Sequence, residues 1–194
     1  MMQKGTQTKT RLLEKTAELL AVQGYHATGL NQITQESGTP IGSLYYYFRG
    51  GKDELVTAAM HVGGDAVAGA LSAAFAAPDM PTAIRSVVQI LAQQLHESDY
   101  QKGCPVATVT LEAAAQNDSI QLTAQAVYRG WQQQIAAYLI QAGYEATQAE
   151  SIAAFSLVVI EGGLLLSRAE RHTAPLEQAG EHLIQYITCL RSKG

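Results

Sequence analysis

The segment from residue 24 to residue 55, GYHATGLNQITQESGTPIGSLYYYFRGGKDEL, carries the side chains best suited to binding a ligand. Tyrosine hydroxyls and lysine reach phosphate oxygens, and such contacts fix a protein on nucleic acid without reading its sequence. Asn31 and Ser43 are small polar residues that can hydrogen-bond base edges, while Ile41 and the ring of Tyr46 can touch a thymine methyl group. These residue types point to double-stranded DNA as a partner.

The spacing within this segment is that of a helix-turn-helix. Short helices are expected over 30–37 and 41–48, and the tight turn Gly38-Thr39-Pro40 lies between them. A glycine-containing turn of about three to four residues joins the two helices of this motif. The second helix is short, so its neighbours must position it, and it can offer its N-terminal end to a major groove.

The second helix has an inward and an outward side. Leu44 and Phe48 lie four residues apart and can dock the helix on its neighbours. Taken alone, the tyrosine triplet 45–47 is typical of a buried aromatic cluster, but three consecutive helical residues cannot all face one core. At least one tyrosine is therefore expected at the surface. The outward side and its flanks carry Gly42, Ser43, Tyr45, Tyr46 and Tyr47.

The rest of the chain also has helical periodicity, which predicts an all-α protein of about nine helices without a sheet. Asp118 or Ser119 is expected to cap the seventh helix. Lys52 is expected at a helix start, where its charge adds to free backbone N–H groups that favour phosphate. The predicted helices cover 9–23, 30–37, 41–48, 52–76, 81–97, a short stretch that begins at Gly103-Cys104-Pro105, 118–142, 147–171 and 175–190.

The composition of the 194 residues excludes several classes of protein. Apolar residues make up 47% and charged residues 15%, enough for a packed core and against disorder. Residues 1–10 contain no apolar signal region, and the stretch 151–167 falls short of the about 18 apolar residues of a membrane span. Cys104 and Cys189 make no disulfide framework, so we expect a cytoplasmic protein with reduced thiols and no membrane partner.

The net charge of −4 is unevenly distributed. Residues 1–52 hold six basic and three acidic residues, a net charge of +3, and the remainder holds seven basic and 14 acidic residues, a net charge of −7. A basic N-terminal quarter indicates an anionic partner for the first part only, although small imbalances also arise by chance.

The segment resembles the N-terminal domain of the tetracycline-repressor (TetR) family of transcriptional regulators. The resemblance covers about residues 8–56 and implies DNA binding by a three-helix domain. The matching residues are Gly24, Tyr25, Thr28, Ile33, Gly38, the run Gly42-Ser43-Leu44-Tyr45-Tyr46-Tyr47-Phe48, Lys52 and Leu55.

By position, the resemblance implies a DNA-binding role for nine residues. Phosphate contacts are implied for Thr28, Tyr45, Tyr47 and Lys52, and base contacts for Asn31, Ile41, Ser43 and Tyr46; Gly42 lies beside them on the outer side of the helix. Two departures matter. The spacing from Phe48 to Lys52 is one glycine longer than usual. Ile41 stands where a polar side chain that contacts bases is expected, so Ile41 can instead pack within the protein.

The C-terminal part resembles the branch of lincomycin-resistance and flavonoid-responsive repressors, on residues 102–107, 111–112, 129–131 and 161–166. The resemblance implies a DNA-binding domain over 1–55 and an effector-binding and dimerisation domain over 56–194. It also implies an unknown hydrophobic or aromatic effector.

Candidate effector and dimer residues come from the apolar helices. A pocket among the central helices is expected to be lined by Tyr100, Cys104, Thr108, Glu112, Tyr128, Trp131 and Phe155, with plain core packing as the alternative for each aromatic. A four-helix dimer interface is expected from Phe155, Val159, Gly162, Gly163, Leu166, Leu183 and Ile187, with an internal core helix of a monomer as the alternative.

The sequence thus predicts a homodimeric, ligand-responsive repressor of transcription that binds a two-fold operator and is released by its effector. It predicts no enzyme, no cofactor and no metal, because the five histidines are scattered and no nucleophilic or phosphate-loop motif is present. Two alternatives remain: a helical small-molecule-binding protein or enzyme with a vestigial DNA-binding motif, and an architectural DNA binder without a ligand.

Overall fold

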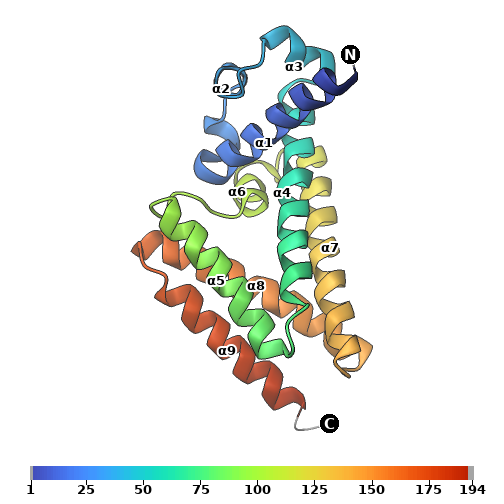
Figure 1. Cartoon of the computed structure of the whole chain (residues 1–194), viewed down its shortest axis with the longest axis vertical. Coiled ribbons are helices and arrows are strands. Elements are labelled where there is room, and N and C mark those ends of the chain that lie inside the picture. The colour runs from blue at the N-terminus through green and yellow to red at the C-terminus, as the bar shows by residue number, and fades with distance from the viewer. Residues whose placement is uncertain (1, 192–194) are drawn as a thin grey trace. The chain divides into compact units, whose positions relative to one another are not determined.

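The computed structural model describes residues 2–191. These residues form nine α-helices and no strand, which confirms the predicted all-α class (Figure 1). The helices are α1 (Met2–Ala27), α2 (Leu30–Glu36), α3 (Ile41–Tyr47), α4 (Lys52–Ala74), α5 (Met80–Glu97), α6 (Pro105–Ala113), α7 (Asp118–Gln141), α8 (Ala146–Glu170) and α9 (Ala174–Arg191).

Local signals fix most helix ends near the predicted positions, but the expected cap of α7 is wrong. The Oδ1 atom of Asn117 accepts the backbone N–H of Ile120 at 3.2 Å and the hydroxyl of Ser119 at 2.7 Å. Asn117 therefore caps α7 in place of Asp118 or Ser119, since its amide oxygen meets one of the free donors of the first turn.

The described chain divides into two compact units. Unit 1 combines the residues up to 66 with residues 104–127, and unit 2 combines residues 67–103 with the residues from 128 onward. Unit 1 takes in α6 and the start of α7 because α6 packs against α1. The division into functional domains at residues 55 and 56 stays a prediction.

The core of unit 1 joins α1, α2, α3 and the start of α4. Leu12, Ile33, Leu44 and Leu55 have no exposed surface, and Phe48 is 2% exposed. Helices α2 and α3 have seven residues each and are too short to be stable alone, so this shared burial holds them against α1 (Figure 1).

A sharp bend interrupts α1 at Gly24, the residue after the predicted end of the first helix, and the helix continues beyond it to Ala27. Its φ of 76° and ψ of −170° lie in a region that only glycine adopts readily. A Cβ atom here would lie 1.8 Å from Oε1 of Glu112, so α6 also occupies the space that a side chain would need. Two independent constraints therefore require glycine at the bend.

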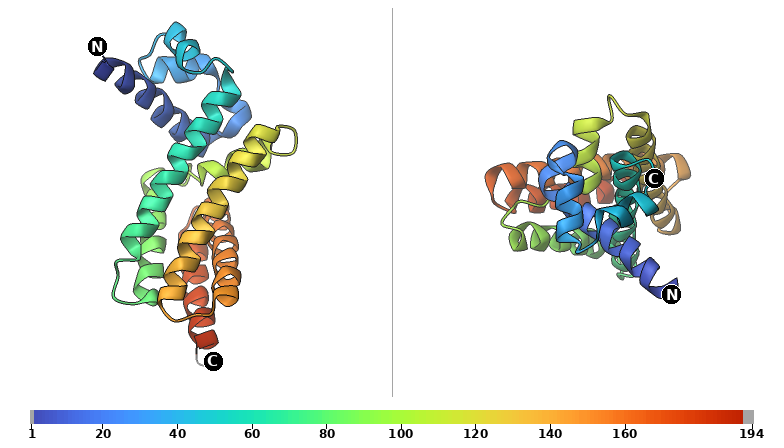
Figure 2. Two further views of the ribbon diagram at one scale, coloured as in Figure 1. Left: turned by 90° about the vertical axis from the view of Figure 1, so that its right-hand side faces the viewer. Right: turned by 90° about the horizontal axis from the view of Figure 1, so that it is seen from above.

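Unit 2 is held together by α8 and α9, with α5 packed on α9 (Figure 2). Ile152 and Ala153 of α8 share a buried cluster with Leu183 and Ile187 of α9. Gly163 allows the two helices to approach closely, because a Cβ atom there would lie 3.0 Å from the backbone of Leu176.

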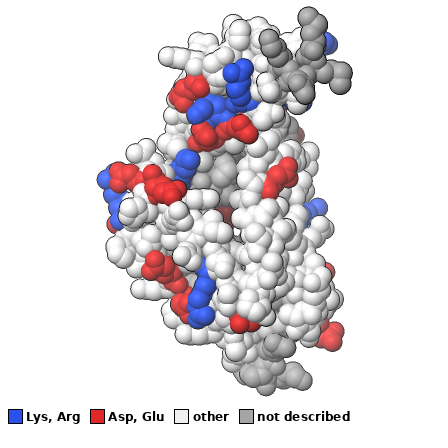
Figure 3. All heavy atoms as spheres, viewed as in Figure 1, with Lys and Arg blue, Asp and Glu red and all other residues white. Residues whose placement is uncertain are grey.

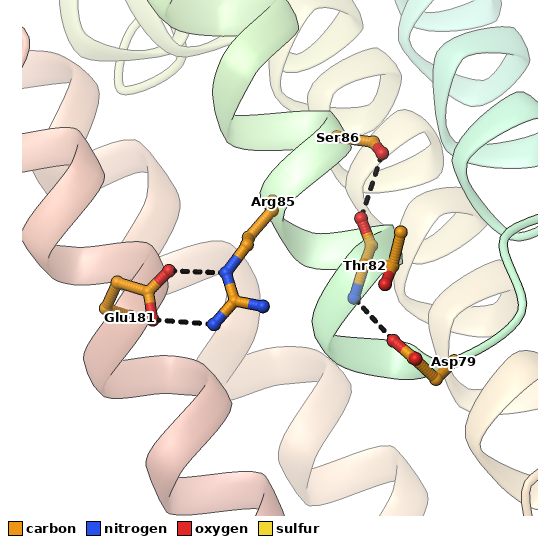
Figure 4. A network of polar contacts seen from close by, with 5 residues as sticks. All are labelled: Asp79, Thr82, Arg85, Ser86 and Glu181. Carbon is orange, nitrogen blue, oxygen red and sulfur yellow. Dashed lines mark hydrogen bonds and ion pairs between the residues drawn. The ribbon is translucent and has the colours of Figure 1, made fainter.

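Polar contacts fix α5 at the surface of unit 2 (Figure 4). Asp79 caps α5 by accepting the backbone N–H of Thr82 at 2.8 Å. Arg85 donates from Nε and Nη2 to the two carboxylate oxygens of Glu181 on α9, at 2.7 and 3.0 Å. These hydrogen bonds lower the pKa of Asp79 and of Glu181, so both carboxylates stay ionised at neutral pH.

Helices α4 and α8 are each long and apolar enough, by length and composition alone, to cross a membrane. Helix α8 includes the stretch 151–167, and the expectation of no membrane partner stays a prediction. Packed helices of globular proteins reach the same hydropathy, so this finding is weak evidence for a membrane location.

We expect Gly24→Ala to lower the free energy of unfolding by about 1–3 kcal/mol through its backbone conformation alone, with a further loss from the clash with Glu112. Measured in a Glu112→Ala background, which lacks the clash, Gly24→Ala should cost only the part that is due to the backbone conformation. Gly42→Ala is the matched control, since Gly42 is helical and its added Cβ would meet nothing within 4 Å. Urea denaturation checks this; equal stabilities of the two alanine variants would contradict it.

Candidate nucleic-acid interface

The turn between α2 and α3 is fixed by the backbone. Gly38 has a φ of 61°, its N–H bonds to the carbonyl of Gln35 at 3.2 Å, and the N–H of Thr39 bonds to the carbonyl of Thr34 at 2.9 Å. A glycine is needed at the positive φ. The angle between the two helices is therefore set by a closed turn, as a helix-turn-helix requires.

Helix α3 buries one side and exposes the other, as predicted. Leu44 and Phe48 lie in the core of unit 1, whereas Ile41 is 43%, Tyr45 51% and Tyr46 71% exposed. Gly42 is also exposed and Ser43 is half-buried. Ile41, Gly42, Tyr45 and Tyr46 are thus accessible from outside the chain, whereas Ser43 is only partly so.

The tyrosine triplet is not a buried cluster. Tyr47 is half-buried, its ring meets the ring of Tyr46 edge-on at 5.0 Å, and its hydroxyl lies against Gly5 of α1. The triplet therefore spreads from the exposed face of α3 toward the beginning of α1, which leaves Tyr45 and Tyr46 for contacts outside the chain.

Two predicted DNA-binding residues outside α3 differ in their placement. Asn31 lies exposed in the first turn of α2. Thr28 has no exposed surface, and its hydroxyl donates to the carbonyl of Gly24 at 2.6 Å. This burial does not fit the predicted phosphate contact by the Thr28 side chain, because its hydroxyl holds the bend of α1 instead.

Lys52 begins α4 but turns toward the protein. Its Nζ atom lies 4.3 Å from the centroid of the Tyr25 ring, a cation–π contact. Burial lowers the pKa of Lys52, against the opposing effect of Asp53 and Glu112. Burial and the hydrogen bond to Asp53 raise the pKa of Tyr25 to about 12, so this tyrosine stays protonated as a donor.

A chain of polar contacts surrounds Lys52 and was not predicted from the sequence. The hydroxyl of Tyr25 donates to Oδ1 of Asp53 at 2.5 Å, and Nδ2 of Asn117 donates to Oδ2 of the same carboxylate at 2.8 Å. The backbone N–H of His26 donates to Glu112 at 2.9 Å. These contacts tie the ends of α1 and α6 and the starts of α4 and α7 together, across separations of 28–86 residues.

The predicted effector residues are divided between the two units. In unit 1, Glu112 holds the bend of α1, and the hydroxyl of Thr108 donates to the carbonyl of Cys104 at 2.9 Å. In unit 2, Tyr100 packs at the cluster of Val88 and Leu164. Glu112 therefore serves the structure of unit 1, a role that its position on an apolar helix did not reveal.

Three side chains of unit 2 do meet. The rings of Tyr128 and Trp131 lie edge-on at 5.2 Å, and the hydroxyl of Tyr128 donates to Oε1 of Glu161 at 3.3 Å. Sequence reasoning named the two aromatic residues but missed Glu161 as their polar neighbour. Phe155 lies elsewhere, 42% exposed and 5.0 Å from the ring of Tyr186 on α9.

An exposed apolar stripe runs along α8. Val158 is 69%, Leu165 59% and Leu166 53% exposed, and Phe155 lies one turn before Val158. Their spacing places them along one helix face with Gly162. The stripe carries no charged residue.

Three residues predicted for the dimer interface are buried inside unit 2. Leu183 is 3% and Ile187 2% exposed, and Gly163 faces α9. Their placement does not fit a contact with a second chain, because the apolar face of α9 packs on α8 of the same chain. Val159 is half-buried.

Basic and acidic side chains lie next to one another on the part of unit 1 that Figure 3 shows. The face is therefore not uniformly positive. Individual cations, rather than a broad basic patch, must make any phosphate contacts there.

Comparisons with known proteins agree with this geometry. Residues 12–59 match the family model of bacterial regulatory proteins of the tetR family, and residues 81–182 match the C-terminal domain of LmrA/YxaF-like transcriptional regulators. The chain is 31% identical over 188 residues to the uncharacterized HTH-type regulator YxaF of Bacillus subtilis, across 96% of this chain and 97% of YxaF. It is 29% identical to the HTH-type transcriptional regulator LmrA of the same organism, across 87% and 90% of the two chains.

Solved structures show the same fold. A regulatory protein TetR from Rhodobacter sphaeroides superposes with a TM-score of 0.80 at 22% identity, across 90% of this chain and 95% of that one. A TetR regulator from Legionella pneumophila gives a TM-score of 0.79 at 22% identity, across 91% and 95%. These matches confirm the resemblance seen in residues 8–56. The chain therefore belongs to the TetR family of DNA-binding transcriptional regulators, with a C-terminal domain of the LmrA/YxaF type.

Proposed function

We propose that the chain is a repressor that binds a two-fold operator as a homodimer and is released by a small hydrophobic or aromatic effector. The observation that carries this proposal is the anchored helix α3, whose outer face presents Ile41, Tyr45 and Tyr46. The protein acts by binding and not by catalysis, and it works in the cytoplasm, where its operator lies.

Helix α3 enters the major groove, and its N-terminal half reads bases. Ser43 and Asn31 hydrogen-bond base edges, and Gly42 allows the backbone to come close to the DNA. Tyr46 and Ile41 supply apolar contact to thymine methyl groups, while the hydroxyl of Tyr45 meets a phosphate.

The second copy of the chain covers the stripe on α8. Exposed apolar residues at 155, 158, 165 and 166 form one continuous face, and Tyr186 of α9 extends it through its contact with Phe155. Two such faces related by a two-fold axis complement each other, as isologous interfaces require. A dimer presents two recognition helices about 34–36 Å apart, the spacing of successive major grooves.

The effector binds in unit 2 beside Tyr128 and Trp131, with Glu161 as a hydrogen-bonding group. Aromatic walls with few polar groups favour a flat, apolar ligand. The effector releases DNA only to the extent that it binds the released conformation better than the DNA-bound one. Helix α4 contributes residues to both units and is the element through which we expect the change to pass.

We expect Ser43→Ala and Asn31→Ala to relax base preference at one position in each half-site, at a cost of about 1–3 kcal/mol in binding free energy. Tyr45→Phe should weaken binding to all sequences alike, because a phosphate contact carries no sequence information. Fluorescence anisotropy on duplexes selected in vitro by the wild-type protein, with single-base variants, measures both effects. An unchanged base preference in both alanine variants would refute the reading role.

The double variant Val158→Lys/Leu165→Lys should convert the dimer to a monomer, since it places charges within an apolar interface. Sedimentation equilibrium should give about twice the 20.8 kDa chain mass for the wild type and a single chain mass for the variant. Leu111→Lys is the control, because Leu111 is 81% exposed but lies on α6. A variant that keeps the wild-type mass would place the interface elsewhere.

Trp131 is the single tryptophan of the chain, so its fluorescence should report effector binding directly. Among apolar aromatic compounds, those that quench this emission should also raise the melting temperature, because they bind the folded state. The same compounds should release selected DNA. Tyr128→Phe, which keeps the ring, should weaken binding of hydrogen-bonding effectors only. Compounds that quench Trp131 and leave DNA binding intact would argue against ligand-controlled release.

A further inference from the structure

The loop between α3 and α4 holds Arg49 at the surface, next to the end of the recognition helix. The N–H of Gly51 bonds to the carbonyl of Phe48 at 3.0 Å, and the N–H of Gly50 donates to Oε2 of Glu54 at 2.7 Å. Gly51 has a φ of 72°. The loop is thus a closed turn, and the backbone of Arg49 is fixed relative to α3.

The extra glycine of this loop changes what Lys52 can do. Lys52 follows Gly51 as the first residue of α4, and its ammonium group lies over the ring of Tyr25 beside the carboxylate of Asp53. To contact DNA, the group would have to leave an aromatic face and a neighbouring negative charge. That loss of cation–π and Coulombic contact disfavours a phosphate role for Lys52.

Few other cations of unit 1 are available for a phosphate. Between residues 5 and 66 and between 104 and 127, the cations are Lys9, Arg11, Lys15, Arg49 and Lys52. Lys15 forms an ion pair with Glu18 at 2.6 Å. Within these residues, the structure shows no carboxylate paired with Arg49.

A second cation lies at the same end of α3 as Arg49. The Nζ atom of Lys9 lies 5.7 Å from the centroid of the Phe48 ring, and Arg49 is the next residue in the chain. Lys9 and Arg49 thus bring two cationic residues close to Phe48, which makes this end of the recognition helix attractive to the DNA backbone.

We propose that Arg49, and not Lys52, makes the backbone phosphate contact that follows helix α3 on double-stranded DNA. The guanidinium group is always charged, and its planar arrangement of N–H donors matches two phosphate oxygens. Arg49 fixes the register of α3 in the groove, while Lys52 stabilises the start of α4 on Tyr25. This inference rests on the DNA-binding function of unit 1.

The experiment compares salt dependence in Arg49→Ala, Arg49→Lys and Lys52→Met. The probe is a duplex selected by the wild-type protein from a randomised pool, and its affinity is measured by anisotropy between 50 and 200 mM salt, about the range in which counterion release is readily seen. Each phosphate contact contributes about 0.9 to the slope of log affinity against log salt. Far-UV circular dichroism verifies that each variant is folded.

Because a dimer carries two copies of Arg49, Arg49→Ala should reduce the magnitude of the slope by about two, so that its deficit relative to the wild type shrinks about twelvefold over this range. Arg49→Lys should restore most of the slope, and Lys52→Met should leave it unchanged. A slope that falls in Lys52→Met, or that stays unchanged in Arg49→Ala, overturns the assignment. Failure of the wild type to select any duplex would instead refute DNA recognition itself, so the two failures are distinguishable.

Discussion

The burial of Leu44 and Phe48 is the interaction on which the proposed DNA-binding face depends. Helix α3 has seven residues, too few to be stable alone, so its orientation comes from these two side chains in the core of unit 1. With both anchored, Tyr45 and Tyr46 have no place in the core and must face outward. The closed turn at Gly38 and the bend at Gly24 contribute to the same orientation, because they position the helices that form the core around Leu44 and Phe48.

The sequence predicts best what depends on neighbours along the chain. Leu44 and Phe48 are four residues apart, and Gly24 and Gly38 stand where helices must end, so local spacing is sufficient to assign them. The nine helices within residues 2–191 follow for the same reason, since proline, glycine and apolar periodicity act within a few residues.

Contacts between distant segments could not be predicted in this way. Glu112 reaches the bend of α1, 86 residues away, and nothing in its own helix indicates that partner. Leu183 and Ile187 form an apolar stripe on α9 that would suit a partner chain equally well, but α8 of the same chain covers it. Lys52 resembles a phosphate ligand by position, yet the ring of Tyr25 determines where its charge lies. In each case the residue type was informative, and its partner was decided by packing.

The central claim is that the exposed face of α3, presented in duplicate, contacts the bases of a double helix. The most direct test replaces Tyr46 with a photo-crosslinking aromatic residue and irradiates the protein on a duplex that the wild type selects. We predict crosslinks at two bases, one in each half-site, about 34–36 Å apart. The same residue at Leu122, 59% exposed on α7, should give none. Crosslinks from position 122 but none from position 46 would contradict the account.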